Sequence, residues 1–281
     1  MLLIFSYIKL SAQVSWGRPD APSMGLKKFF GGLQFMYNIN EISEIENALL
    51  RTAPLEYGKF FDNANSLVSF TTDFYNKVDF NYWLFLGFSA QVQNSLFLAI
   101  ISTLRRHDVQ TNMMLRQALE SVVLTCYSAY NKDENDFAQK TSEGLLILNE
   151  KVLNKTYKWL EANYKTHSDK IEFMKKHINE TSAHSNILHV FQNTDLSQNR
   201  RIVTSFFDGN NEDMEHFRAM IKQRLWWIGN IAFGLIDLLS KVITDFKVGK
   251  VIDNFPQIMT ELGSENQSLM EELKRNPRFS K

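Results

Sequence analysis

An arginine and a glutamate lie four residues apart in the middle of an apolar stretch, "RRHDVQTNMMLRQALESVVLTCYSAY". On a helix, Arg116 and Glu120 are neighbours and fall between the apolar and the polar faces. Arginine before glutamate is the less favourable order for an exposed helical pair, so surface stabilisation explains the pair poorly. We therefore expect Arg116 to be mostly buried and to contact both Glu120 and a group from another helix, because buried polar groups need partners.

Three further polar side chains on apolar segments could meet this pair. Asn94 and Arg105 share one narrow stripe of the preceding segment, and Arg224 lies within the apolar stripe of a later one. Inside a protein, an unpaired polar group costs about 1–3 kcal/mol. The sequence thus predicts a single buried network that comprises Arg116, Glu120, Asn94, Arg105 and Arg224. Such a network either fixes helix packing or lines a functional pocket, and the residue types leave both interpretations open.

A second group of polar residues lies in "KKHINETSAHSNILH". His177 and His184 are separated by about 10 Å along a helix, too far for both imidazoles to bind one metal ion. A histidine beside lysine and asparagine can instead do acid–base work on a phosphodiester. In this hypothesis His184 is the general acid or base, and Asn179 orients the substrate. Lys176, or alternatively Arg116, stabilises the phosphate charge in the transition state.

Composition limits the classes of function. The chain has 31 basic and 31 acidic residues, so no overall positive field attracts nucleic acid, although a local basic groove is compatible with this balance. Cys126 is the single cysteine, which excludes an intrachain disulfide and fits a reducing, cytoplasmic compartment. No glycine-rich phosphate loop or paired-cysteine motif occurs, and we expect neither a metal nor a cofactor.

The pattern of the chain is typical of an all-α protein. Long runs with a period of 3.6 residues, five prolines and twelve glycines predict a bundle of about six to eight helices. At most one small β-hairpin is expected, around 187–207. The apolar runs 82–101 and 226–243 are long enough to test as membrane spans, but each carries polar residues at its centre. We expect both to be buried helices of a soluble protein without a membrane partner.

The individual elements are expected as follows. Helices are predicted over 41–50, 55–78, 80–107, 108–130, 168–185 and 212–246, with one or two more over 133–164. Pro54 is expected near the start of the second helix, and Asp108 as the N-cap of the fourth. In the tail, Pro256 suits the first turn of one short helix, and Ser264 with Gln267 forms a capping box for another.

The domain organisation is simple. Residues 1–23 are expected to form an irregular N-terminal extension, 24–250 a single helical domain, and 251–281 a tail of short helices. On the helix over 212–246, Trp226 and Phe233 fall opposite the apolar stripe. A solitary domain has little reason to expose both, so we expect a homo-oligomer, most simply a homodimer, or a protein partner.

Three segments carry a resemblance to known proteins: "RRHDVQTNMMLRQALESVVLTCYSAY", "YKWLEANYKTHSDKIEFMKKHINETSAHSN" and "FFDGNNED". In that order they resemble a family of uncharacterised bacterial all-helical proteins, over roughly 80–245. The R-x3-E pair of that family matches Arg116 and Glu120, and its "IN…AHSN" turn matches Asn179, His184 and Asn186.

The helical layout is also similar, more distantly, to HEPN-like domains of toxin–antitoxin and abortive-infection systems. Many of those are metal-independent ribonucleases with an R-x4-6-H motif. His184 has that spacing from Asn179, which stands where the motif has arginine. The lack of a recognisable catalytic motif and the expected exposure of Trp226 and Phe233 favour a protein that acts by binding, and the resemblance suggests a bacterial defence or stress module as its setting. The alternative is a metal-independent ribonuclease, for which RNA is the substrate, and whether the chain is an enzyme stays open.

Overall fold

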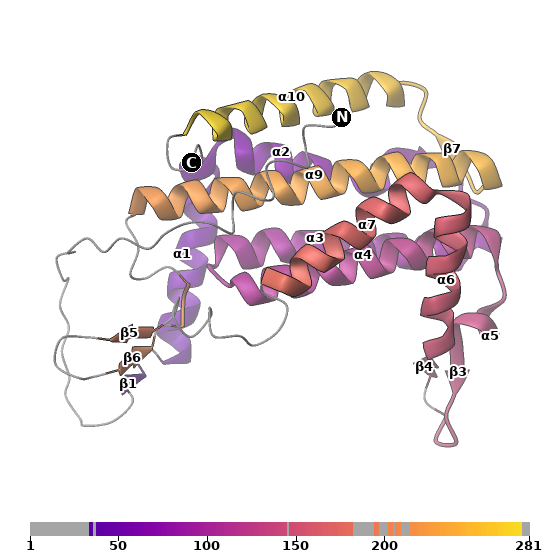
Figure 1. The fold of residues 1–281 in the computed structure, drawn as a ribbon, viewed down its shortest axis with the longest axis horizontal. Coiled ribbons are helices and arrows are strands. Elements are labelled where there is room, and N and C mark those ends of the chain that lie inside the picture. The colour runs from indigo at the N-terminus through magenta and orange to yellow at the C-terminus, as the bar shows by residue number, and fades with distance from the viewer. Residues whose placement is uncertain are drawn as a thin grey trace.

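A computed structural model describes residues 34–35, 38–144, 146–181, 194–196, 202–204, 206–208 and 214–276 of the chain (Figure 1). The predicted extension over 1–23 lies outside these residues. Within them the fold is an all-α bundle, as expected. Eight of its helices have fourteen or more residues, and a ninth, α5, has four. The helices are α1 (Ile39–Tyr57), α2 (Lys59–Asp73), α3 (Trp83–Leu104), α4 (Asp108–Tyr130), α5 (Glu134–Phe137), α6 (Glu150–Asn163), α7 (Lys165–Thr181), α9 (Met214–Phe246) and α10 (Phe255–Arg275).

Helix α9 runs through the centre of the bundle and packs against α2, α3, α4 and α10 (Figure 1). Its predicted apolar stripe is confirmed, because every member is at most 1% exposed. The stripe comprises Ile221, Leu225, Ile228, Ala232, Leu235, Leu239 and Val242. Burial of seven such side chains is a main source of stability, since each large one contributes about 1.5–3 kcal/mol.

Helices α3 and α4 form an antiparallel pair joined by a three-residue turn. Arg106 occupies the left-handed region in this turn, with φ of 64°. His107 takes the N-cap position, so the prediction of Asp108 as N-cap is wrong by one residue. Asp108 is instead the first residue of α4, and its backbone N–H donates to the carboxylate of Asp208. One of the N–H groups that have no partner within α4 therefore receives a cap from a distant segment.

The boundary between the first two helices differs from the prediction. Pro54 lies inside α1, near its C-terminal end, and not at the start of α2. Helix α1 ends at Gly58, whose φ of 47° favours glycine. Asn38 starts α1 with a capping box: its side chain accepts from the N–H of Glu41, and the Glu41 carboxylate accepts from the N–H of Asn38.

Three small β-sheets accompany the helices in the described part of the chain. The predicted hairpin is present as β5 (Thr194–Leu196) and β6 (Ile202–Thr204), with β1 (Gln34–Phe35) parallel to β6. A second hairpin, β3 (Ala138–Lys140) with β4 (Leu146–Leu148), occupies part of the range predicted to be one or two helices. It exceeds the single hairpin expected. A further two-residue pairing joins β2 (Tyr75–Asn76) to β7 (Lys250–Val251), next to the 3-10 helix Phe80–Tyr82.

The C-terminal tail forms a single long helix, α10, and not two short ones. Pro256 lies in its first turn, as predicted. Ser264 does not cap a second helix, because its hydroxyl donates to the carbonyl of Thr260 one turn earlier. Serine in the interior of a helix commonly makes this bond.

Helix α10 covers the aromatic residues of α9 that were expected to be exposed. Trp226 is only 5% exposed, and its indole Nε1 donates to the carbonyl of Asn266, 3.0 Å away. Phe233 packs against the core beside Gly263. The buried amide of Asn266 also accepts from Asn63 of α2 (3.1 Å) and donates to Asn230 of α9 (3.2 Å). The argument for a homodimer from exposed α9 aromatics is therefore wrong.

Two helices are long and apolar enough to cross a membrane by length and composition alone, and they differ in burial. In α9, 61% of the most apolar window is buried inside the bundle, which agrees with the expected buried helix. In the segment of α3, only 39% is buried. The expected buried helix is therefore only partly buried in the case of α3.

Candidate functional site

Arg116 and Glu120 lie on the side of α4 that faces α7. The Nε atom of Arg116 donates to Oε1 of Glu120 over 3.1 Å. Their side chains are 36% and 31% exposed, so Arg116 is partly buried and about a third of its side chain stays accessible to solvent. The predicted contact with another helix is confirmed, because Nη1 of Arg116 donates to Oδ1 of Asn179 on α7 over 3.2 Å.

Two more side chains complete this group. Lys175, one turn before Asn179 on α7, places its Nζ 3.3 Å from Oε1 of Glu120. The same Nζ donates to the hydroxyl of Tyr157 on α6 over 2.8 Å. We call Arg116, Glu120, Tyr157, Lys175 and Asn179 the Arg116 cluster. It joins three helices at a partly exposed surface.

The charges of the Arg116 cluster are unequal. Arg116 and Lys175 carry two positive charges and share one carboxylate, that of Glu120. Burial raises the pKa of Tyr157 above its ordinary value, and the nearby Glu120 carboxylate raises it further. Tyr157 therefore stays a neutral phenol at physiological pH. The cluster as a whole has a net charge of about +1.

The remaining members of the predicted network do not reach the Arg116 cluster. Arg224 binds Asp108, with Nη2 2.8 Å from Oδ2. Arg105 lies 3.5 Å from the carboxylate of Glu46 on α1, and Asn94 is exposed on α3. The prediction of one network is therefore wrong. Asp108 lies two helical turns before Arg116 on α4. Because Arg224 is bound to Asp108, it is too far from Arg116 to join the cluster.

The other catalytic candidates separate as well. Asn179 belongs to the Arg116 cluster, but Lys176 is 74% exposed and pairs weakly with Glu180 at 3.8 Å. His184 lies outside the described residues. His177 packs edge-on against the ring of Trp227, and burial lowers its pKa. In the part of the chain that the structure describes, no group of three or more His, Cys, Asp or Glu side chains could hold a metal ion.

Sequence reasoning missed two members of the cluster. Lys175 stands four residues before Asn179, so helical spacing alone puts both on one face, and this signal could have selected it over Lys176. Tyr157 gave no such signal, because only the packing of α6 against α7 brings its hydroxyl to Lys175.

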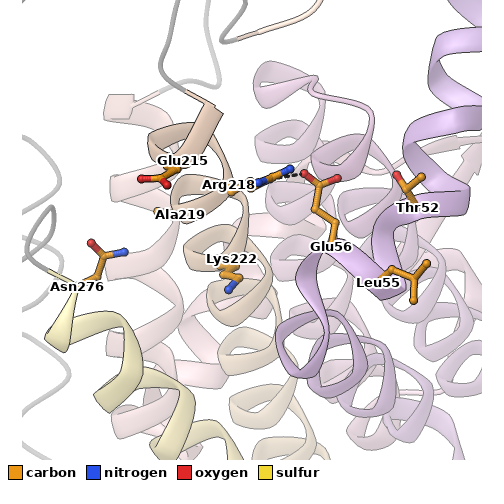
Figure 2. Close-up of a pocket in the computed structure, with 8 residues that line it drawn as sticks. All are labelled: Thr52, Leu55, Glu56, Glu215, Arg218, Ala219, Lys222 and Asn276. Carbon is orange, nitrogen blue, oxygen red and sulfur yellow. Dashed lines mark hydrogen bonds and ion pairs between the residues drawn. The ribbon is translucent and has the colours of Figure 1, made fainter.

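A surface hollow of about 680 Å³ lies elsewhere, between α1, α9 and α10 (Figure 2). Its lining comprises Thr52, Leu55, Glu56, Glu215, Arg218, Ala219, Lys222 and Asn276. The Nε atom of Arg218 donates to Oε1 of Glu56 over 2.8 Å, and this pair spans the hollow in Figure 2. Two acids and two bases give the lining no net charge, and it contains no histidine, cysteine or serine. The hollow is therefore less suited to bind a charged ligand than the Arg116 cluster, which has a net positive charge.

Comparison of the chain with protein-family models, with curated proteins and with solved structures gave no match. The family resemblance suggested by the sequence motifs therefore stays a prediction.

Proposed function

We propose that the protein is a binding protein whose Arg116 cluster receives a phosphate group of RNA. The observation that carries the proposal is the sharing of one carboxylate by two cations at a partly exposed surface. The Glu120 carboxylate holds both Arg116 and Lys175, and neutralises only one of their charges. A phosphodiester is a fitting ligand for such a positively charged pair.

The hydrogen-bonding capacity of the cluster supports an anionic ligand. The acceptor atoms Oδ1 of Asn179 and Oη of Tyr157 are already engaged by Arg116 and Lys175. The amide NH₂ of Asn179, the phenolic O–H of Tyr157 and further N–H groups of Arg116 are donors. A ligand that approaches these groups meets mostly donors, as the oxygen atoms of a phosphate require.

A matched pair of lysines tests this proposal. Lys175→Met and Lys176→Met remove the same charge from adjacent positions, but only Lys175 belongs to the cluster. Binding is measured by fluorescence anisotropy with a labelled single-stranded RNA at fixed salt. We expect Lys175→Met to weaken binding about tenfold and Lys176→Met less than about twofold. Equal losses for the two variants, or no binding by the unmodified protein, would contradict the proposal.

A second candidate function is a metal-independent ribonuclease. It is favoured by the 3.2 Å hydrogen bond between Arg116 and Asn179, which joins the two segments in which the sequence predicts catalytic residues. In this reading Arg116 stabilises the phosphate charge and His184 transfers the proton. The test compares RNA cleavage by the unmodified protein and by His184→Ala, with a chelator present. Cleavage that survives the substitution excludes His184, and no cleavage by the unmodified protein excludes the class.

The proposed setting is the cytoplasm of a bacterium, in a defence or stress module. The proposed partner besides RNA is a second copy of the chain.

A further inference from the structure

Helix α3 has an outer surface that is unusual for a helix at the edge of a bundle. Its 22 residues include no charged side chain. A helix that borders solvent normally carries charged or polar residues on its outer side. Here three large apolar side chains remain exposed on the helix, namely Trp83 at 44%, Leu86 at 37% and Leu98 at 46%. Phe80, just before the helix, is 83% exposed.

The exposed residues of α3 share one face. At about 100° per residue they fall within an arc of roughly 140°, and this arc runs for roughly 22 Å along the axis. We call this surface the α3 outer face, and it comprises Trp83, Leu86, Gly87, Ala90, Gln91, Asn94 and Leu98. The opposite side of the helix is packed against α2, α4 and α9. The exposed apolar residues are therefore gathered in a patch and not scattered.

Gly87 gives an independent indication that something approaches this face. Glycine is a poor helix former and costs about 1 kcal/mol relative to alanine inside a helix, so a close approach of another backbone would explain its presence. Apart from its own chain neighbours and the adjacent turns of the α3 backbone, no described atom lies within 4 Å of where a Cβ of residue 87 would stand. Packing within the described part of the chain therefore gives no reason for glycine here. A second helix that crosses close to Gly87 and Ala90 does, because small residues let two backbones approach.

The chemistry of the face favours a second copy of the same chain. Helix α3 itself contributes no charge to this face, and the nearby carboxylate of Glu134, which accepts from the Trp83 indole over 3.2 Å, lies at one end of it. Two identical faces can therefore meet around Gly87 and Ala90 across a two-fold axis without repulsion. Asn94 and the exposed Gln91 have amides that both donate and accept, so each can pair with its own counterpart. The same amides would be costly against lipid.

The area agrees with a dimer of modest size. From the usual size of these side chains, Phe80, Trp83, Leu86 and Leu98 together expose on the order of 400 Å². Two copies would bury about twice this amount through these residues alone. The other exposed residues of the face, Gly87, Ala90, Gln91 and Asn94, add to this area and bring it toward the lower limit for a stable interface, about 1,200 Å². We infer that the protein forms a homodimer through the α3 outer face, with the two helices crossing at Gly87 and Ala90. This inference does not depend on RNA binding.

Cysteine cross-linking tests the geometry. Cys126 is the single cysteine of the chain and is fully buried, so a cysteine introduced at the surface is the one accessible thiol. Ala90→Cys should give a covalent dimer under mild oxidation, and Ser268→Cys, at an exposed position of α10, should not. Equal cross-linking of both variants, or none for Ala90→Cys, would overturn the inference.

Light scattering coupled to size-exclusion chromatography tests the association itself. Ala90→Arg brings a charge to the centre of each face and should raise the dimer dissociation constant by roughly a hundredfold. Ser268→Arg is the matched control and should leave it unchanged, and circular dichroism establishes that both variants are folded. A monomeric unmodified protein at every concentration overturns the inference. If that monomer also floats with phosphatidylcholine vesicles, and Ala90→Arg does not, the face binds membrane instead.

Discussion

Of the ion pairs in the described part of the chain, the one between Asp108 and Arg224 is the most enclosed. Breaking it should strongly lower the free energy of unfolding. The two side chains are only 9% and 17% exposed, and their closest atoms are 2.8 Å apart. Arg224→Met leaves the carboxylate of Asp108 without its counter-charge, and Asp108→Asn leaves the guanidinium of Arg224. Breaking a buried pair costs about 3–5 kcal/mol. Because Arg224 keeps some contact with solvent, we expect about 3 kcal/mol for each single change.

The double variant Asp108→Asn/Arg224→Met should lose much less, about 1–2 kcal/mol, because it leaves no unpaired charge inside the bundle. Arg116→Met is the control: it breaks a pair that is one third exposed, and should cost less than about 1 kcal/mol. Urea unfolding measures all four changes. With a slope of about 3 kcal/mol per molar urea, each single variant shifts the midpoint by about 1 M. Equal losses for Arg224→Met and Arg116→Met, or a double variant that loses the sum of the two, would refute the reasoning from burial.

Three further predictions concern other contacts. The hydrogen bond from His167 lowers the pKa of Asp237 well below its usual range, with a further contribution from Lys241. This contribution to stability is present above about pH 4 and is lost as the pH falls through the depressed pKa. From urea unfolding, the free energies of unfolding of Asp237→Asn and of the unmodified protein should differ at pH 7 by less than about 1 kcal/mol, because the carboxylate is 44% exposed. The two values should converge below about pH 2. Asn266→Leu leaves two amide partners unpaired and should destabilise the protein by about 3 kcal/mol in the same assay, whereas a neutral effect would contradict the buried contacts. Gly249→Ala places a Cβ 2.8 Å from the backbone oxygen of Asn76 and should lower the melting temperature by about 5 °C. An unchanged melting temperature would contradict this prediction, because the backbone would then move to accept the Cβ without a loss of stability.

Periodicity within one helix was enough to predict the part of the core that α9 contributes. The apolar stripe of α9 depends only on the spacing of its own residues, so the sequence already identifies it. The same reasoning placed Arg116 beside Glu120, because an i,i+4 contact is internal to α4.

Contacts between helices could not be predicted in this way. Arg224 meets Asp108 rather than Arg116 because of how α9 is placed along α4, and no local pattern encodes this placement. The capping-box pattern at Ser264 was misleading for a related reason: the same hydroxyl can bond backwards to Thr260, and the packing of α10 along α9 favours a continuous helix. Trp226 was likewise predicted to be exposed, because the residue of α10 that covers it, Asn266, follows it in the sequence by forty residues.

The amide of Asn266 has a consequence for the position of α10 along its axis. An amphipathic helix of this length could slide by one turn along α9 and still bury a comparable set of apolar side chains. Such a shift would bring Leu262 or Met270 to the place of Asn266, opposite the amides of Asn63 and Asn230. Leucine cannot hydrogen-bond to them and the methionine sulfur is only a weak acceptor, so each displaced arrangement loses contacts that the native one makes. The three amides therefore select one alignment among several that hydrophobic burial alone would leave nearly equal in free energy.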